Sequence, residues 1–344
     1  MEPVSESFTV GGPAAGDGFS LDLRRLAVLR ELRRRGSLAA TAQALHLTPS
    51  AVSQQIAALS RETGAPLTER AGRGVRLTGQ ARILLDHADR IAAQLERARS
   101  DLAAYESGAR GTVTLGAFSS AIVGLLPDAL RTLADRLPEV EIRVREAQPP
   151  DVFTALDAGR IDVVVAVDFT ATPPHTDRRY TRTDLLTDVL DLALPPGHRL
   201  APHARVNLRD LATERWIVGD AANCCGAVTR AVCAAAGFSP DIRHEVDDWS
   251  AVAALVAAGA GVALIPRLVQ HAYAPHEVTL HAATPTPSRN VFAAVRAGAE
   301  HNPVVGAVVE ALRNRPSPED RCSPGEGQGH LGGFPHAVAS PRRE

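Results

Sequence analysis

The sequence predicts an α/β protein that begins with an all-α module. Three observations predict this fold class: two short helices joined by a tight turn within residues 38–62, an uninterrupted helical pattern over residues 79–108, and strands that alternate with helices from residue 112 to residue 313. Such alternation is typical of parallel βαβ units with right-handed crossovers. We therefore expect a helical module, a long linker helix and an α/β domain, in this order.

The helical module contains a predicted helix-turn-helix. A first helix begins after Asp22 and ends at Gly36. In the next two helices, Thr48 is placed to cap the second, and Pro49 fits its first turn, where no amide hydrogen bond is lost. The apolar positions of these two helices recur at helical spacing and are Leu38, Ala42 and Leu45, then Val52, Ile56 and Leu59.

The start of the second helix of this pair presents a short, polar and uncharged face. Such a face suits base edges in a major groove of DNA. The alternative is that serine and glutamine merely solvate a surface helix, since helical hairpins are common. The residues that we expect at the DNA are Ser37, Thr48, Pro49, Ser50, Ser53, Gln54 and Gln55.

The segment PLTERAGRGVRLT follows the helix-turn-helix and contains two short extended pieces around two glycines. We interpret it as a β-wing. Arg70, Arg73 and Arg76 would then meet phosphates or an adjacent minor groove. Arginines beside glycines are also common on ordinary surface turns, but the position next to a helix-turn-helix favours phosphate contact.

Charge is distributed unevenly along the chain. The net charge is only −2 and every basic residue is an arginine, yet residues 21–80 carry ten arginines against four acidic residues, whereas residues 111–344 carry 22 against 27. A basic module is therefore joined to an acidic remainder, which predicts double-stranded DNA as the partner of the module.

The linker segment, residues 79–108, predicts a helix roughly 45 Å long at 1.5 Å per residue. This length exceeds what one small domain needs to cover itself, so we expect the apolar stripe to pack on a second copy, in a dimer or a tetramer. The stripe consists of Ile83, Leu84, Ala88, Ile91, Leu95, Ala98 and Leu102.

The two ends of the chain are rich in glycine, proline and small polar residues, and we expect them to be disordered. The predicted divisions are a disordered stretch 1–20, a winged helix-turn-helix domain 21–78, a linker helix 79–108, an α/β domain 112–313 and a disordered tail 314–344.

Composition excludes several classes of protein. The four cysteines, two of them adjacent, form neither a disulfide framework nor a paired Cys-x-x-Cys metal pattern, and we expect no metal and no cofactor. The N-terminal stretch has acidic residues and no apolar core, and no apolar run reaches the roughly 18 residues that span a membrane. We expect a cytoplasmic protein without a membrane partner.

The stretch RRLAVLRELRRRGSLAATAQALHLTPSAVSQQIAALSRETGAPLTERAGRGVRLT resembles the N-terminal domain of LysR-type transcriptional regulators. The resemblance continues to Leu312 through FSSAIVGLLPDAL, LDAGRIDVVVAV, AAAGF and LVAAGAGVALIP. One departure is that Ser50 stands where the family often has proline, with Pro49 one residue earlier, so the family's base preference is not carried over.

The resemblance implies that the α/β domain is an effector-binding domain with the two-subdomain fold of type II periplasmic binding proteins. The expected subdomains are 112–187 with 268–313, and 188–267. A hinge near Asp188 and Pro266 would couple occupancy of the cleft to the angle between the subdomains.

Candidate residues for the cleft follow from the ends of strands and the starts of helices, where small-molecule sites converge. Ser119 and Ser120 open a helix and could hold an anion such as a carboxylate, although simple helix capping explains them as well. For Asp168 and Trp249, structural packing is the stronger alternative. The further candidates, also at strand ends, are Gln148, Asp220 and Asn223.

Cys224 and Cys233 support an alternative function. Their spacing, and the stretch that runs into AAAGF, resemble the redox cysteines of the peroxide-sensing branch of the LysR family, and Cys224 lies at a predicted helix N-terminus that favours a thiolate. Against this, Asn223 stands where those sensors have histidine, Cys225 is an extra thiol, and nine residues along one helix separate the sulfurs too far for a disulfide without local unfolding.

The sequence therefore predicts a sequence-specific transcription regulator of the LysR type, controlled by a small-molecule co-inducer in the C-terminal cleft. Its expected partners are operator DNA, the effector, further copies of itself and RNA polymerase. An enzyme is the first rival, but no nucleophile elbow, phosphate-binding glycine loop or metal triad occurs. A solitary solute-binding module, the second rival, would need an export signal and no basic N-terminal domain.

Overall fold

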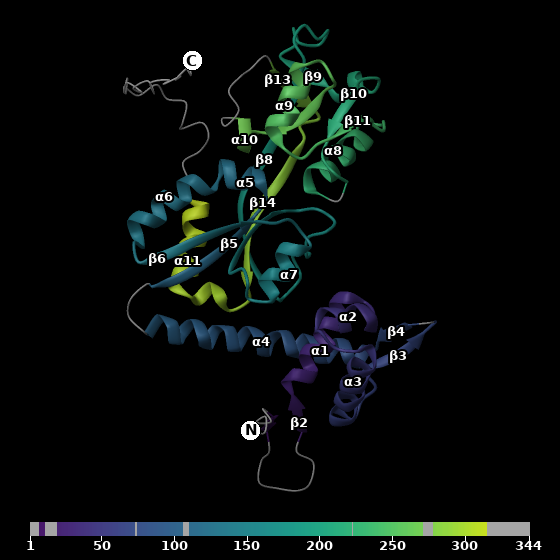
Figure 1. The fold of residues 1–344 in the computed structure, drawn as a ribbon, viewed down its shortest axis with the longest axis vertical. Helices are drawn as coiled ribbons and strands as arrows, with labels where there is room; N and C mark the ends of the chain where they lie inside the picture. The colour runs from purple at the N-terminus through teal and green to yellow at the C-terminus, as the bar shows by residue number, and fades with distance from the viewer. Residues whose placement is uncertain are drawn as a thin grey trace, which may run out of the picture.

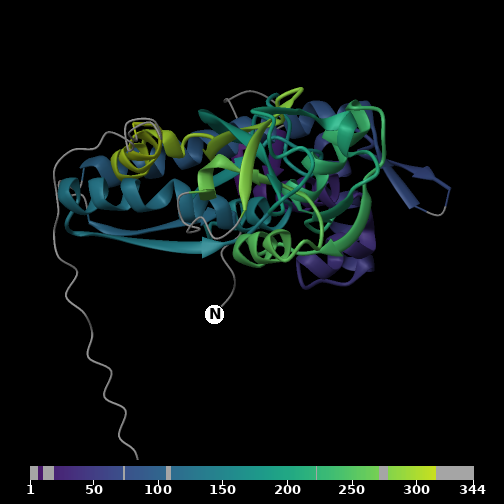
Figure 2. The same ribbon diagram turned by 90° about the horizontal axis from the view of Figure 1, so that it is seen from above.

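The computed structural model describes residues 7–10, 19–72, 74–105, 110–221, 223–270 and 278–314. A long helix, α4, joins a helical module to an α/β domain with two lobes (Figure 1). The hairpin of strands β3 (Thr68–Ala71) and β4 (Gly74–Leu77) projects away from the rest of the chain (Figure 2). Within the described ranges, no helix is both long and apolar enough to cross a membrane.

The helical module contains the predicted helix-turn-helix. Thr48 Oγ1 accepts a hydrogen bond from the amide of Ala51 at 3.1 Å, and Pro49 is the first residue of the helix that follows. Gly64, with φ of +63°, ends that helix in the left-handed conformation that glycine adopts without strain. The three helices of the module are α1 (Leu23–Arg35), α2 (Leu38–Ala44) and α3 (Pro49–Thr63).

Apolar side chains from α1, α2, α3 and the start of α4 form one core. Leu29, Val52 and Leu59 are fully buried in it, and each such side chain stabilises the fold by about 1.5–3 kcal/mol relative to an exposed position. Because α3 has a buried face here, its polar face is turned outward. The wing is an antiparallel pair of strands, β3 (Thr68–Ala71) and β4 (Gly74–Leu77).

The N-terminal stretch differs from the prediction of disorder over residues 1–20. Two short strands, β1 (Ser7–Val10) and β2 (Phe19–Asp22), pair in antiparallel register. The two strands are paired through backbone hydrogen bonds, and such pairing does not require a periodic side-chain pattern that could be recognised in the sequence. Residues 1–6 and 11–18, and residues 315–344 of the expected C-terminal tail, lie outside the described residues.

Helix α4 (Gly79–Tyr105) is 27 residues long, about 40 Å at 1.5 Å per residue. One face of it is tied to both parts of the chain. Asp89 accepts hydrogen bonds from Arg30 at 3.1 Å and from Arg33 at 2.8 Å in α1, and Glu96 pairs with Arg296 of the α/β domain at 3.1 Å. The helix therefore connects the module and the α/β domain through side-chain contacts as well as through the backbone.

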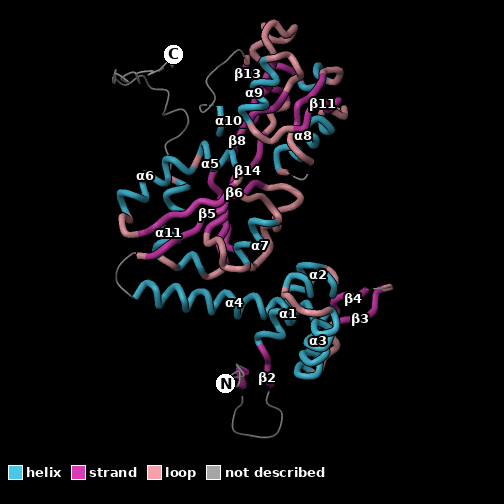
Figure 3. Tube along the Cα trace, viewed as in Figure 1, coloured by secondary structure: helices cyan, strands magenta, loops and turns pink. Residues whose placement is uncertain are grey.

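Lobe I of the α/β domain comprises residues 110–189 and 288–313. Its sheet has the order β6-β5-β7-β14-β8, in which β5 is parallel to β6 and β7, and β14 is antiparallel to β7 and β8. Helices flank this sheet (Figure 3). The elements are β5 (Gly111–Ala117), α5 (Ser119–Gly124), α6 (Leu126–Arg136), β6 (Val140–Glu146), α7 (Asp151–Asp157), β7 (Val163–Val167), β14 (Ser288–Arg296), the 3₁₀ turn Ala299–His301 and α11 (Pro303–Arg313).

Strand β8 (Tyr180–Leu194) runs through both lobes. Its residues 180–189 pair with β14 in lobe I, and its residues 190–194 pair with β12 and β13 in lobe II. The elements of lobe II, residues 190–284, are β9 (Arg205–Asn207), the 3₁₀ turn Leu208–Leu211, β10 (Arg215–Val218), α8 (Cys224–Ala235), β11 (Asp241–Glu245), α9 (Trp249–Ala257), β12 (Ala263–Pro266), α10 (Arg267–Gln270) and β13 (Thr279–Thr284).

The second crossing between the lobes lies later in the chain than the sequence predicted. The expected hinge at Pro266 would return the chain to lobe I with residues 268–313. Leu268 does pack in the apolar core of lobe I, but Thr279–Thr284 pairs with the far part of β8 and with β9, both in lobe II. The return therefore occurs between β13 and β14, because the sheet of lobe II requires β13 as a strand. The first crossing is near Asp188, as expected.

Candidate functional site

The outward face of α3 carries the residues expected to read bases. Ser50, Ser53 and Gln54 are exposed, while Val52 and Ile56 on the opposite face of the same helix are buried. Gln55 is also exposed, but its Oε1 accepts a hydrogen bond from Arg25 Nε at 3.3 Å. This leaves a short polar face at the N-terminal end of α3, where recognition helices contact base edges.

Three further residues of the expected DNA-binding set lie at helix starts: Ser37, Thr48 and Pro49, the last being the first residue of α3. Ser37 accepts a hydrogen bond from the amide of Ala40 and caps α2. Thr48 caps α3, and its Oγ1 also lies 2.9 Å from Ser50 Oγ. Capping fixes the direction in which α3 leaves the turn, so these residues orient the polar face whether or not they touch DNA.

The wing presents two of its three expected arginines. Arg70 is exposed. Arg76 is exposed too, and it pairs with Glu69 across the hairpin at 2.8 Å, so part of its charge is already compensated. Arg73 lies outside the described residues. The described part of the wing therefore favours Arg70 as a phosphate contact.

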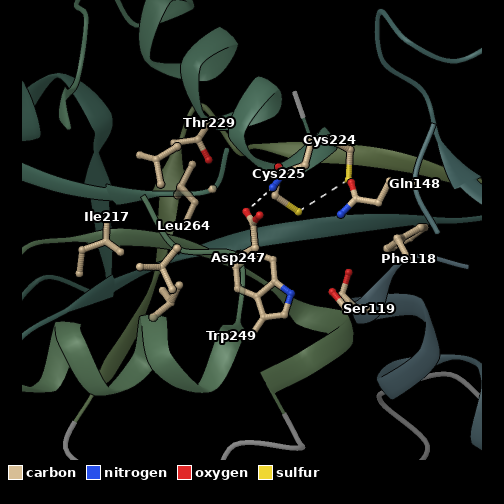
Figure 4. Close-up of a pocket in the computed structure, with 16 residues that line it drawn as sticks. Phe118, Ser119, Gln148, Ile217, Cys224, Cys225, Thr229, Asp247, Trp249 and Leu264 are labelled. Atoms are coloured by element: carbon tan, nitrogen blue, oxygen red, sulfur yellow. Dashed lines mark hydrogen bonds between the residues drawn. The ribbon is translucent and has the colours of Figure 1, made fainter. Parts of the chain in front are cut away.

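The α/β domain has a cavity between its lobes. Its volume is about 20 Å³, room for roughly one water molecule. Figure 4 shows Gln148 and Ser119 facing Asp247 and Trp249 across it. The lining includes, from lobe I, Phe118, Ser119, Ser120 and Gln148, and from lobe II, Asn223, Cys224, Cys225, Thr229, Asp247 and Trp249.

Five of the seven expected effector-binding residues line this cavity: Ser119, Ser120, Gln148, Asn223 and Trp249. Gln148 is notable because its Oε1 is buried without a hydrogen-bond partner. A buried amide oxygen in that position costs free energy unless something donates to it. It is therefore a buried polar atom of the cavity with unused capacity for a ligand.

The two other expected residues lie outside the cavity lining. Asp168 follows β7, but its Oδ1 accepts a hydrogen bond from Arg182 Nη2 at 2.6 Å, and His175 lies at 3.5 Å from its other oxygen. Asp220 contributes its amide, which donates to Asp247 Oδ1 at 3.0 Å. Asp168 therefore forms an ion pair inside lobe I, and Asp220 supports the cavity from outside its lining.

Asp247 is a cavity residue that the sequence did not single out. Its Oδ1 accepts hydrogen bonds from the amide of Asp220 and from the side chain of Asn223. Asn223 in turn caps α8, because its Oδ1 accepts from the amide of Gly226 at 2.8 Å. Asp247 therefore holds the N-terminal end of α8 against the cavity. Its position at a strand end, two residues beyond Glu245, the last residue of β11, is the signal that could have found it.

Arg289 is the second residue that the sequence did not single out. It lies at the start of β14 and forms an ion pair with Asp188, in which Arg289 Nη2 and Asp188 Oδ2 are 2.8 Å apart. The two side chains are 0% and 1% exposed. Arg289 also donates to Ser120 Oγ at 2.7 Å, within lobe I, and to Cys225 Sγ at 3.0 Å, in lobe II. One buried guanidinium therefore links both lobes beside the first crossing.

In this arrangement Cys224 and Cys233 lie too far apart to form a disulfide directly, as the sequence predicted. Cys224 and Cys225 have their sulfurs 3.8 Å apart, whereas Cys233 packs in a different apolar cluster, that of Leu190 and Trp216. Nine residues of α8 correspond to a rise of about 13 Å, far beyond a disulfide. Burial raises the pKa of Cys233 to about 11, which keeps it a neutral thiol at physiological pH.

The electrostatics around Cys224 and Cys225 are different. The hydrogen bond with Cys225, together with the Arg289 guanidinium, lowers the pKa of Cys224 to about 7 against the effect of burial. The same hydrogen bond and burial raise the pKa of Cys225. The pair therefore carries at most one thiolate at neutral pH, because a second buried negative charge beside the first is unfavourable. Among the described residues, no group of three or more metal-ligating side chains occurs.

Comparison with known proteins identifies the family. The model of the bacterial regulatory helix-turn-helix protein, lysR family, matches residues 23–82, and that of the LysR substrate binding domain matches residues 106–317. The transcriptional regulator MetR of Escherichia coli is 29% identical over 298 residues, which cover 86% of this chain and 90% of MetR. A probable hydrogen peroxide-inducible genes activator of Mycobacterium avium is 30% identical over 246 residues, 71% of this chain and 76% of that protein.

A solved structure shares the fold over most of the chain. HinK, a LysR family transcriptional regulator from Pseudomonas aeruginosa, matches with a TM-score of 0.53 and 21% identity, over 86% of this chain and 98% of HinK. The substrate-binding model alone covers more than half of the chain, and it follows a matched helix-turn-helix in the order that the structure shows. The chain belongs to the LysR family of transcriptional regulators.

Proposed function

We propose that this regulator reads a specific operator sequence with the N-terminal end of α3 and changes its arrangement on DNA when a small molecule enters the cleft between its lobes. The observation that carries the first part is the exposed, uncharged polar face of Ser50, Ser53 and Gln54 on a helix whose other face is buried. Amide and hydroxyl groups of this kind discriminate bases in the major groove.

Charge supports the same assignment. The module 21–80 has six more arginines than acidic residues, and on the wing Arg70 is exposed beside α3. Phosphate contacts of this type supply affinity that is independent of sequence and falls with salt. Base reading by α3 and phosphate contact by the wing thus divide specificity and affinity between two neighbouring elements.

The cleft supports the second part of the proposal. Its buried Gln148 amide oxygen has unused acceptor capacity, and Ser119, Asn223 and Trp249 add polar and apolar surface around it. The volume of about 20 Å³ is far below the roughly 300–1,000 Å³ of small-molecule sites. An effector of ordinary size would therefore bind by separating the lobes, and its preference for the open arrangement would set the coupling, typically about 1–3 kcal/mol.

Self-association is the third part of the proposal, and α4 supports it. Ile83, Leu95 and Leu102 are 63%, 55% and 70% exposed. Their spacing places them on one helical face, together with Ile91, away from the face that contacts α1 and Arg296. Large apolar side chains arranged in this way are typical of a helix that pairs with a second copy. A dimer would present two α3 helices to a two-fold symmetric operator.

We further propose RNA polymerase as a partner and the cytoplasm as the location. Both follow from the family function, because a transcription regulator meets its operator and the polymerase in the same compartment. Control by the effector would then act through the geometry of the paired modules on DNA.

Footprinting of the purified protein across genomic DNA tests base reading. We expect discrete, two-fold symmetric footprints. Gln54→Ala should reduce the difference in binding free energy between operator and non-specific DNA by about 1–3 kcal/mol, the value of one good base contact. Gln94→Ala is the matched control, since Gln94 is an exposed glutamine on α4. Uniform binding along the DNA, or an unchanged ratio in Gln54→Ala, would refute the assignment of α3.

A further inference from the structure

Two adjacent cysteines lie at the N-terminal end of α8 and line the cleft. The sulfurs of Cys224 and Cys225 are 3.8 Å apart, and Figure 4 shows the line that joins them inside the cavity. Cys224 is 2% exposed and Cys225 is half-buried. The proposed effector function leaves this pair without a role.

A buried guanidinium activates the pair. Arg289 Nη1 lies 3.0 Å from Cys225 Sγ and 3.8 Å from Cys224 Sγ. This contact and the hydrogen bond between the two thiols lower the pKa of Cys224 to about 7. A thiolate, which is the nucleophilic form of cysteine, is therefore present at neutral pH in a shielded position.

Backbone geometry disfavours a disulfide between these residues. Consecutive Cα atoms are about 3.8 Å apart across a trans peptide, whereas disulfides usually join Cα atoms about 4.4–6.8 Å apart. Closing the bond would also bring the sulfurs from 3.8 Å to about 2.05 Å. A single atom that bridges both sulfurs requires neither change.

The distance between the sulfurs restricts the bridging atom. Two bonds of about 2.3 Å, the length of a metal–thiolate bond, meet at an angle of about 110° when the sulfurs are 3.8 Å apart. A linear two-coordinate cation would need the sulfurs about 4.6 Å apart. The described residues contain no cluster of three or more metal ligands for a tetrahedral ion. The geometry therefore fits a pyramidal, thiophilic centre that exchanges two of its substituents for sulfur.

We propose that Cys224 and Cys225 form a capture site for monosubstituted trivalent arsenicals. In the reaction, two As–S bonds form and the two hydroxyl groups of R–As(OH)₂ leave as two molecules of water. One proton comes from the thiol of Cys225, and the other comes from Cys224 or, where Cys224 reacts as the thiolate, from solvent. Arsenic remains trivalent, so neither an oxidant nor a reductant takes part. The volume of the cavity, about 20 Å³, favours a small substituent such as methyl.

Capture has a structural consequence, and this step rests on the proposed function. Bridging neutralises the thiolate beside Arg289, whose guanidinium also holds Asp188 at the first crossing and Ser120 in lobe I. Loss of that charge weakens the contact of Arg289 with lobe II while its contacts in lobe I remain. The arsenical would thereby favour separation of the lobes, as an effector does.

Intact-mass measurement of the full-length protein with one equivalent of methylarsonous acid, in the presence of excess glutathione, tests the capture site. We expect one methylarsenic group per chain in the wild type, because the second thiol reacts as an intramolecular group with a high effective concentration. Cys224→Ser and Cys225→Ser should each lose the adduct to glutathione. Cys233→Ser, a buried thiol of the same helix, is the matched control and should retain it.

Each outcome separates this proposal from its rivals. No adduct in the wild type, an adduct that persists in Cys225→Ser, or loss of the adduct in Cys233→Ser overturns the capture site. If a serine variant melts early, protection of Cys224 and Cys225 from alkylation in the arsenical-treated wild type decides the matter instead. A disulfide between the two residues after peroxide treatment would overturn the argument from backbone geometry.

Operator binding with and without the arsenical forms a separate arm. Capture that leaves operator affinity unchanged refutes the coupling through Arg289 and leaves the site itself intact. Capture by a protein without any operator preference refutes the proposed DNA reading alone. An arsenical that weakens or strengthens operator binding in the wild type, and does neither in Cys225→Ser, supports both the site and its coupling.

Discussion

Replacement of Arg289 by methionine removes the cation of the most buried ion pair in the described part of the α/β domain. The side chains of Arg289 and Asp188 are 0% and 1% exposed. Methionine keeps much of the volume and length of the side chain but cannot donate a hydrogen bond. Asp188 would then lose two donated hydrogen bonds, at 3.0 and 2.8 Å, while it remains in a position that water does not reach.

The expected cost is about 3–5 kcal/mol in the free energy of unfolding, the range for deleting one partner of a buried pair. For a domain of roughly 200 residues, a cost of this size lowers the melting temperature by about 10 °C. Removing the carboxylate as well should restore most of the loss, because a buried pair contributes little over an apolar replacement of similar volume. The double variant Asp188→Leu with Arg289→Met should therefore be more stable than Arg289→Met alone.

The assay is urea unfolding of the full-length protein at one fixed protein concentration, since association shifts apparent stability. The four proteins of the double-mutant cycle give the coupling between the two side chains. A loss below about 1 kcal/mol for Arg289→Met, the level of a surface ion pair, would refute the reasoning. So would a double variant whose loss equals the sum of the two single losses.

Three further predictions concern DNA, association and thiol reactivity. Arg70→Ala should weaken binding to all DNA sequences alike and reduce the slope of log affinity against log salt by about one; an unchanged slope in a salt titration would exclude Arg70 as a phosphate contact. Leu95→Glu should shift the sedimentation coefficient towards that of a single chain, because it places a charge in the exposed stripe of α4; an unchanged coefficient would locate self-association elsewhere. The rate of alkylation of Cys224, followed by peptide mapping, should rise with pH around a midpoint near 7, because only the thiolate reacts and the pKa of Cys224 is lowered to about 7. Cys233, whose pKa is raised to about 11, should react slowly below pH 9 in the same experiment.

Local signals predicted the helical module well. Thr48 and Pro49 act within one turn of their own positions, and the structure confirms Thr48 as the cap of α3 and Pro49 at its first turn. Of the apolar positions that the periodicity predicted, Leu38 and Leu45 are partly buried against the core, and the others are buried in it: Ala42, Val52, Ile56 and Leu59. These features depend on contacts three or four residues apart, which a sequence displays directly.

The cleft was predicted less completely because its key contacts join distant segments. Asp168 follows β7, as a ligand-binding residue would, but Arg182 on β8, two strands away in the same sheet, pairs with it. Arg289 and Asp188 are 101 residues apart and meet only through the register of β14 on β8. The crossing at β13 likewise depends on its pairing with β8 and β9. No periodic pattern in the sequence reports register between strands so far apart.

The shared strand β8 explains why the pair of Arg289 and Asp188 is placed where it affects function. Because β8 contributes to the sheets of both lobes, any change of the angle between them must bend or twist it between residues 189 and 190, where its partner changes from β14 to β12. Asp188 lies directly before that point, and Arg289 holds it together with Ser120 and Cys225. A ligand that alters the surroundings of Arg289 therefore acts on the backbone that must move, with no need for a chain of intermediate contacts.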